Sequence, residues 1–126
     1  MMYVIAALLG LLSVAFGAFG AHALKQVLTP KLLDTFEVAV RYQFIHVFAM
    51  FVSAWFFQVY DKLSFKWSWV LFLIGIILFS GSLYSYVLTG SRALVFITPV
   101  GGVCLMVGWA LMAFGFIVSR KRAEDE

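Results

Sequence analysis

The chain has 126 residues, of which 64% are hydrophobic and 12% are charged, and its mean hydropathy is +1.04. Soluble domains carry roughly 25% charged residues, so this composition excludes a water-soluble fold and favours an integral membrane protein. The formal net charge of +3 bears on orientation and on contact with anionic lipid in such a protein. We therefore expect membrane lipids as partners and no nucleic-acid partner.

Charged residues are absent from four long stretches of the chain. No Asp, Glu, Lys or Arg occurs in residues 1–24, 42–60, 67–91 or 93–119. A helix needs roughly 20 largely apolar residues to cross a hydrocarbon core about 30 Å thick. The pattern predicts an all-α fold, a bundle of four transmembrane helices that forms one membrane domain over residues 1–126.

The first helix is expected over about residues 3–24. Ala21-His22-Ala23 has the form of a signal-peptide cleavage site, but no Lys or Arg precedes it and the apolar run is longer than a usual signal core. We therefore expect this segment to be a retained helix.

The second helix is expected over about residues 30–60. Thr29 provides a capping hydroxyl, and Pro30 is favoured in the first turn because it needs no hydrogen bond there. Glu37 and Arg41 are four residues apart on one helix face, in the favourable order for an ion pair.

The third and fourth helices are expected over about residues 67–88 and 98–118. Trp67 at the start of the third fits an interfacial anchor. Arg120-Lys121-Arg122 is expected to stop the fourth helix and to open a basic and acidic tail, residues 120–126. Lys and Arg near the helix ends slightly favour the side that holds the termini, so we expect a multi-pass cell-membrane protein with both termini in the cytoplasm.

Small residues recur on one face of each expected helix. Since lipid is as apolar as leucine, close approach of backbones at small residues drives helix association in membranes. The spacing of about 3.5 residues predicts left-handed, tight packing near +20°, with bulky Phe and Leu turned to lipid. The seams could instead serve a partner protein or a second copy. The helix-packing residues of the first and fourth helices are Ala6, Gly10, Ser13, Gly17, Gly20, Gly101, Gly108 and Gly115.

Polar residues gather in the leaflet opposite the termini if successive helices alternate in direction. Lipid cannot satisfy polar groups, so these side chains are expected to face the bundle interior. They form either interhelical hydrogen bonds, worth about 0.6 kcal/mol each, or a pocket for a headgroup, ion or cofactor. The residues of this candidate polar pocket are His22, Arg41, Gln43, His46, Ser80, Ser82, Tyr84 and Thr98.

His22 and His46 are expected near one depth on neighbouring antiparallel helices. Two imidazoles can bind haem or a metal in principle, but the sequence offers no third zinc ligand and no carboxylate at that depth. We expect hydrogen-bonded packing histidines, with no metal and no cofactor. Cys104 is the sole cysteine and is interpreted as a packing residue.

Five sequence blocks resemble a known family. They are Gly17-Ala18-Phe19-Gly20-Ala21-His22, Tyr42-Gln43-Phe44-Ile45-His46, Phe79-Ser80-Gly81-Ser82-Leu83-Tyr84, Thr98-Pro99-Val100-Gly101-Gly102 and Gly108-Trp109. In this order they are similar to the signature blocks of the domain-of-unknown-function family 423, whose eukaryotic relatives are the transmembrane protein 256 proteins. The resemblance implies a small multi-pass membrane protein, in bacteria of the cytoplasmic membrane, and it implies no catalytic activity or catalytic residues.

Several functions are compatible with these observations. The favoured one is a non-enzymatic membrane protein that stabilises the envelope or supports assembly of a complex, with another membrane protein or itself as partner. The alternative is a small transporter, or a protein that binds lipid, haem or quinone through His22 and His46. An enzyme is disfavoured, because the sequence offers no set of nucleophile, base and acid.

Overall fold

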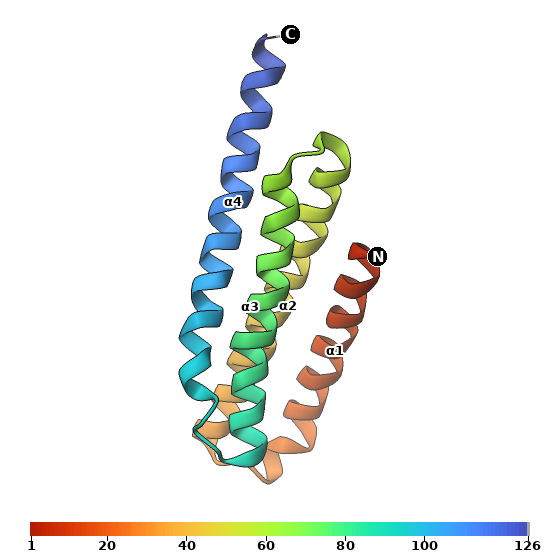
Figure 1. Ribbon diagram of the computed structural model, residues 1–126. Helices are drawn as coiled ribbons and strands as arrows, with labels where there is room; N and C mark the ends of the chain where they lie inside the picture. The colour runs from red at the N-terminus through yellow and green to blue at the C-terminus, as the bar shows by residue number, and fades with distance from the viewer. Residues whose placement is uncertain (126) are drawn as a thin grey trace.

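The computed structural model describes the backbone of residues 1–125 and the side chains of residues 1–120, and this part of the chain contains helices and no strands. The four long helices are each apolar enough to span a membrane (Figure 1). They are α1 (Met2–His22), α2 (Pro30–Tyr60), α3 (Leu63–Thr89) and α4 (Thr98–Asp125), with single 3₁₀ turns η1 (Leu24–Gln26) and η2 (Val95–Ile97). The predicted all-α four-helix bundle is confirmed.

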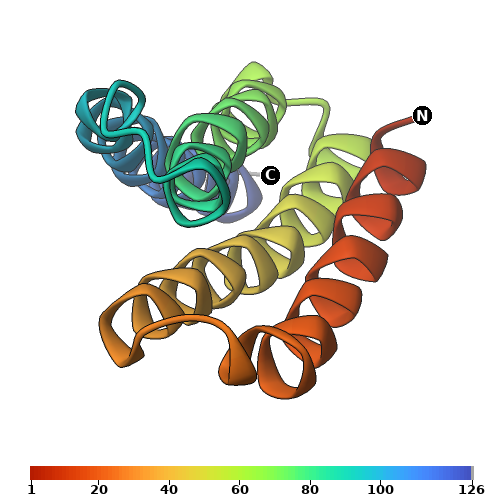
Figure 2. The same cartoon turned by 90° about the horizontal axis from the view of Figure 1, so that it is seen from below.

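Each helix packs mainly on its neighbour in sequence. Helix α1 lies on α2, α2 lies on α3, and α3 lies on α4, while α2 and α4 touch over a short length only. Within the described residues the backbone of α1 has no close approach to α3 or α4. Figure 2 shows the result, in which α1 and α2 diverge from the α3–α4 pair. Helix α1 is therefore covered by protein along one side only.

The helix ends follow local chemistry, and two of them differ from expectation. Helix α2 starts where the Thr29 hydroxyl accepts a bond from the Leu32 amide at 3.4 Å, with Pro30 in its first turn. Helix α3 ends at Thr89 and is capped by Gly90, whose φ of 70° favours glycine. Helix α3 begins at Leu63, earlier than residue 67, because Ser, Phe and Lys there are compatible with a helix.

Helix α4 also continues past residue 118, as far as Asp125. The Arg120-Lys121-Arg122 run does not stop it, since Lys and Arg are good helix formers and can leave the bilayer without ending the helix. Of the predicted tail, residue 126 and the side chains of residues 121–126 lie outside the described residues.

Helices α3 and α4 pack through three glycine notches at a spacing of seven residues. The backbone of Gly101 lies directly against the backbone of α3. A Cβ atom on Gly101 would lie 2.8 Å from the carbonyl carbon of Leu78. One and two heptads further along α4, the rings of Phe72 and Phe65 come within 2.8 Å of the Cβ positions of Gly108 and Gly115, respectively. The two phenylalanines are themselves one heptad apart and fully buried, so the repeats run in antiparallel register.

A similar but looser seam joins α1 to α2. The Phe36 ring would lie 2.9 Å from a Cβ on Gly20, whereas Val40 and Val47 lie at ordinary contact distances of 3.6 and 3.4 Å from Gly17 and Gly10. The interior phenylalanines correct the expectation that bulky Phe faces lipid. Those that fill glycine notches are buried, because a flat ring fits the space a missing side chain leaves, while others such as Phe96 and Phe114 are exposed.

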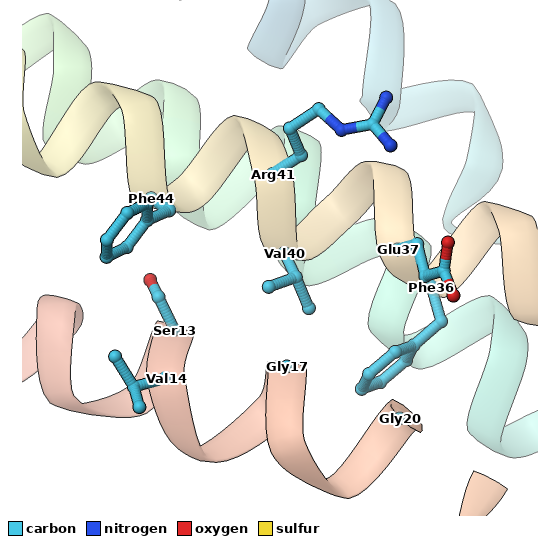
Figure 3. Close-up of a pocket in the computed structure, with 9 residues that line it drawn as sticks. All are labelled: Ser13, Val14, Gly17, Gly20, Phe36, Glu37, Val40, Arg41 and Phe44. Carbon is cyan, nitrogen blue, oxygen red and sulfur yellow. The ribbon is translucent and has the colours of Figure 1, made fainter. Parts of the chain in front are cut away.

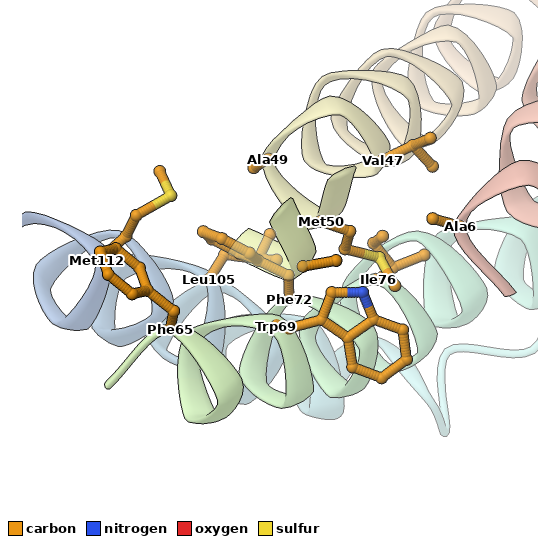
Figure 4. Packing of buried hydrophobic residues seen from close by; sticks show 11 residues of the cluster. Ala6, Val47, Ala49, Met50, Phe65, Trp69, Phe72, Ile76, Leu105 and Met112 are labelled. Carbon is orange, nitrogen blue, oxygen red and sulfur yellow. The ribbon is translucent and has the colours of Figure 1, made fainter. Parts of the chain in front are cut away.

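The remaining core lies between α2, α3 and α4, and Ala6 of α1 joins it at one side (Figure 4). Helix α2 turns a face of small residues inward, including Ala39, Ala49 and Ser53, which lets α3 approach closely. Met50 and Phe72 fill the centre and are fully buried. Trp69 points its ring nitrogen into this core, where it has no hydrogen-bond partner within the described part of the chain.

The notches predict unequal responses to the same substitution. Gly101→Ala should lower the free energy of unfolding by roughly 1–3 kcal/mol, since the added methyl group meets the backbone of Phe79 and Leu78. Gly81→Ala on α3 has nothing within 4 Å and should stay within about 0.5 kcal/mol of the parent. Unfolding of the purified chain by SDS in mixed micelles measures both. Equal losses would contradict the assigned notch.

Candidate functional site

Gln43 joins three helices near the middle of the bundle. Its side chain is buried on α2. Its amide nitrogen donates to the Leu9 carbonyl of α1 at 2.9 Å, and its amide oxygen accepts from the Tyr84 hydroxyl of α3 at 2.8 Å. Tyr84 packs edge-on against Phe16 of α1, with ring centroids 4.9 Å apart. This ring contact links α1 to α3.

Two serine hydroxyl groups of α3 form hydrogen bonds to the neighbouring helices α2 and α4. The Ser80 hydroxyl donates to the Ala39 carbonyl of α2 at 2.7 Å. The Ser82 hydroxyl donates to the Phe79 carbonyl at 2.9 Å and lies 2.6 Å from the Thr98 hydroxyl at the start of α4. Ser82 has a single hydrogen, which its bond to Phe79 uses, so the Thr98 hydroxyl is the donor to Ser82.

His46 links α2 to α4 with both of its ring nitrogens engaged. The indole N–H of Trp109 donates to Nε2 at 3.1 Å, and Nδ1 lies 2.6 Å from the Tyr42 carbonyl one turn earlier on α2. An indole nitrogen can only donate, so Nε2 is the acceptor and Nδ1 carries the hydrogen. The ring also contacts Phe72 in the core, at a centroid distance of 5.6 Å. His46 is thus a neutral, fully hydrogen-bonded side chain.

His22 does not join His46, and the expectation of a shared depth is wrong. Val47 lies against Gly10, which places His46 beside the middle of α1. His22 ends α1, about 18 Å further along at 1.5 Å per residue, and its side chain is exposed. The expectation placed both histidines in one leaflet from the alternating helix directions alone, but α2 begins at Pro30, so His46 lies 16 residues, or about 24 Å, into that helix. Haem or metal held between the two histidines does not fit this geometry.

A second polar layer lies nearer the ends of the helices that hold the termini, outside the predicted polar pocket. The Ser68 hydroxyl of α3 donates to the Gly108 carbonyl of α4 at 2.8 Å and lies 3.2 Å from the Ser53 hydroxyl of α2. Ser53 also donates to the Met112 sulfur at 3.4 Å. Ser68 was missed because it follows Trp67 at the predicted helix start; the helix actually begins at Leu63, one turn earlier.

Arg41 lies apart from the buried hydrogen-bonded groups, on the rim of a groove between α1 and α2 (Figure 3). The groove has a volume of about 380 Å³ and an apolar lining in which the small residues of α1 face large ones of α2. Its lining includes Ser13, Gly17, Gly20, Phe36, Val40 and Phe44.

Glu37 shares that rim, one turn from Arg41 on α2. Both side chains are exposed, and within the described residues they form no ion pair, contrary to expectation. An exposed pair of this kind gains at most about 1 kcal/mol, which is too little to fix two long side chains.

A second cavity of about 340 Å³ lies on the opposite flank, between α3 and η2. Ser82 and Ser85 reach it, and the rest of its lining is aliphatic apart from Gly81. Neither Gln43 nor His46 borders this cavity or the α1–α2 groove. The structure therefore uses the buried polar groups mainly to join helices.

The fold and its polar interior define a class: a small multi-pass integral membrane protein whose four helices are held by glycine notches and interhelical hydrogen bonds. The chain belongs to the family of proteins of unknown function called DUF423, whose family model matches residues 16–102. The matched region contains the signature blocks from Gly17 to Gly102, so the resemblance seen in the sequence is confirmed.

Similar proteins occur in distant bacteria. The UPF0382 inner membrane protein YgdD of Escherichia coli K12 is 40% identical over 99% of this chain and 96% of its own. A UPF0382 membrane protein of Haemophilus influenzae is 41% identical over 91% and 92%, and one of Staphylococcus epidermidis is 37% identical over 86% and 88%. No solved structure matches. These relatives confirm a membrane location.

Proposed function

We propose that the chain is a non-enzymatic membrane protein that stabilises the cell membrane or supports the assembly of a complex within it. The observation that carries this proposal is the use of Gln43, His46 and Ser80, which direct their polar atoms at neighbouring helices. A hydrogen-bonded interior of this kind holds helices in register. It offers no free base or nucleophile to a substrate.

On this proposal, the protein acts through its outer surface, which contacts lipid or a partner protein. Helix α1 packs against protein along one side only. Its other side is an apolar face that includes the exposed side chains of Leu8, Leu11 and Phe19. Membrane lipids cover such a face in a monomer, while a second membrane protein or a second copy covers it in an assembly. These are the partners we propose.

Transport, or binding of haem or quinone through His22 and His46, gains no support from this geometry. The two imidazoles differ in depth by about 18 Å, and both nitrogens of His46 are engaged. Proton transfer through His46 would require Trp109 to withdraw from Nε2.

We propose that both termini lie in the cytoplasm, as the Lys and Arg distribution favours. Single cysteines added after residue 126 and at Ser91, in a Cys104→Ala background, should report opposite sides. An impermeant maleimide applied to intact cells should label the Ser91 position and leave the C-terminal one unlabelled. The reverse pattern would overturn the orientation while leaving the fold intact.

The structural role of the polar interior predicts stability effects without ligand effects. Tyr84→Phe removes one interhelical hydrogen bond and should lower the free energy of unfolding by about 0.6 to 1.7 kcal/mol. His46→Ala also removes a buried ring that contacts Phe72 and should lower it by more. Tyr86→Phe is the matched control, because Tyr86 has no side-chain hydrogen bond within the described part of the chain. SDS unfolding measures stability, and mass spectrometry compares the lipids and small molecules that co-purify.

Unchanged co-purifying molecules with lower stability would support the proposal. Loss of one specific small molecule from His46→Ala, with stability equal to that of Tyr86→Phe, would contradict it and favour a ligand-binding function.

A further inference from the structure

The groove between α1 and α2 combines an apolar cavity with two unpaired charges of opposite sign. Arg41 and Glu37 are exposed on one rim, four residues apart on α2, and neither forms an ion pair within the described residues. A charged side chain inside a spanning helix is costly and calls for a partner. A ligand that carries both an anion and a cation is complementary to these two side chains.

The two charges lie at different depths. Phe36 packs on Gly20, and Val40 packs on Gly17, so Glu37 is level with the end of α1 and the Arg41 backbone is about 6 Å deeper. Figure 3 shows the Arg41 side chain extending toward the end of α2 at which Glu37 lies, as an arginine inside a membrane does to reach the interface. In the same view the guanidinium lies short of the Glu37 carboxylate, so the cation is on the acyl-chain side of it.

We propose that this groove binds a phospholipid with a phosphoethanolamine headgroup. In such a lipid the phosphate lies next to the glycerol and the primary ammonium lies further out, which is the order of Arg41 and Glu37. The guanidinium donates to the phosphate oxygens, and the carboxylate accepts from the ammonium. One acyl chain lies in the apolar groove along Gly17, Val40 and Phe44, where α1 leaves α2 uncovered.

The proposal distinguishes among headgroups. Phosphatidylglycerol offers the phosphate without a cation, so Glu37 gains nothing from it. Phosphatidylcholine has a quaternary ammonium, which has no hydrogen to donate to a carboxylate. Binding should therefore be strongest for phosphatidylethanolamine when the acyl chains are the same.

Native mass spectrometry of the purified chain in detergent, titrated with dioleoyl lipids of the three headgroups, tests the proposal. Phosphatidylethanolamine should bind about fivefold more tightly than phosphatidylcholine, as expected for one exposed charge pair. Glu37→Gln should abolish that preference, and Arg41→Gln should weaken the binding of all three lipids. Gly17→Leu, which fills the groove, should weaken the binding of all three as well. Asp34→Asn and Arg92→Gln, exposed and outside the groove, are the matched controls.

Equal affinity for the three headgroups, or tighter binding of phosphatidylglycerol, would overturn the assignment. So would an unchanged preference in Glu37→Gln whose SDS unfolding matches the parent. Glycerophosphoethanolamine, which has the headgroup and no acyl chains, should fail to compete at lipid concentrations; equal competition would exclude the acyl groove. None of these outcomes depends on the proposed role of the polar interior, because the variants lie outside it.

Discussion

Close packing of rings into glycine notches is the constraint on which this structure depends. Lipid tails are as apolar as leucine, so removal of apolar side chains from lipid gives little net attraction between helices. Attraction must come from many short contacts, and these require backbones or rings to fit into spaces left by missing side chains. The repeat of Gly101, Gly108 and Gly115 against an antiparallel repeat of α3 provides such contacts over most of the length of the pair.

The polar contacts follow from that register. Ser68 reaches the carbonyl of Gly108, a notch residue, because the missing side chain exposes that backbone oxygen. Trp109, the next residue, is then turned so that its indole reaches His46. A shift of α4 by one residue would misplace both bonds. Helix α2 is the common partner, since its hydrogen bonds reach all three other helices.

Helix α1 is held differently, and this difference creates the groove. Its seam with α2 closes at Gly20 and Phe36 but is at ordinary contact distance at Gly17 and Gly10. Helix α1 meets α3 through the Phe16–Tyr84 ring contact and has no close backbone approach to it. The half of α2 that α1 leaves uncovered carries Arg41 and Glu37. The looser seam therefore leaves a groove open between the two helices, and the charges of Arg41 and Glu37 lie at its rim.

The sequence alone predicts the helices well, because a bilayer imposes length and charge rules that few other structures meet. The start of α2 at Pro30 follows from its cap, and the α4 glycines are evident from their spacing. Depth was less predictable. His46 was assigned to the same leaflet as His22 from helix direction alone, but by residue 46 α2 has run about 24 Å from Pro30, and His46 lies beside the middle of α1.

The partners of small residues were also beyond prediction. Glycine spacing marks a seam without saying what fills it, and Phe65 and Phe72 look like any lipid-facing aromatic residue in the sequence. Backbone acceptors such as the Leu9 carbonyl carry no sequence signal at all. What the sequence does supply is the list of polar groups that lipid cannot satisfy, and the structure then shows which helix satisfies each.

A double-mutant cycle between Gly108 and Phe72 tests the notch account most directly. Gly108→Ala, Phe72→Leu and the double variant are compared with the parent by SDS unfolding in mixed micelles. The ring of Phe72 would lie 2.8 Å from the new methyl group, so the smaller, flexible leucine should relieve the clash. The account predicts that the double variant loses at least about 1 kcal/mol less than the sum of the single losses. Additivity within about 0.5 kcal/mol would contradict it.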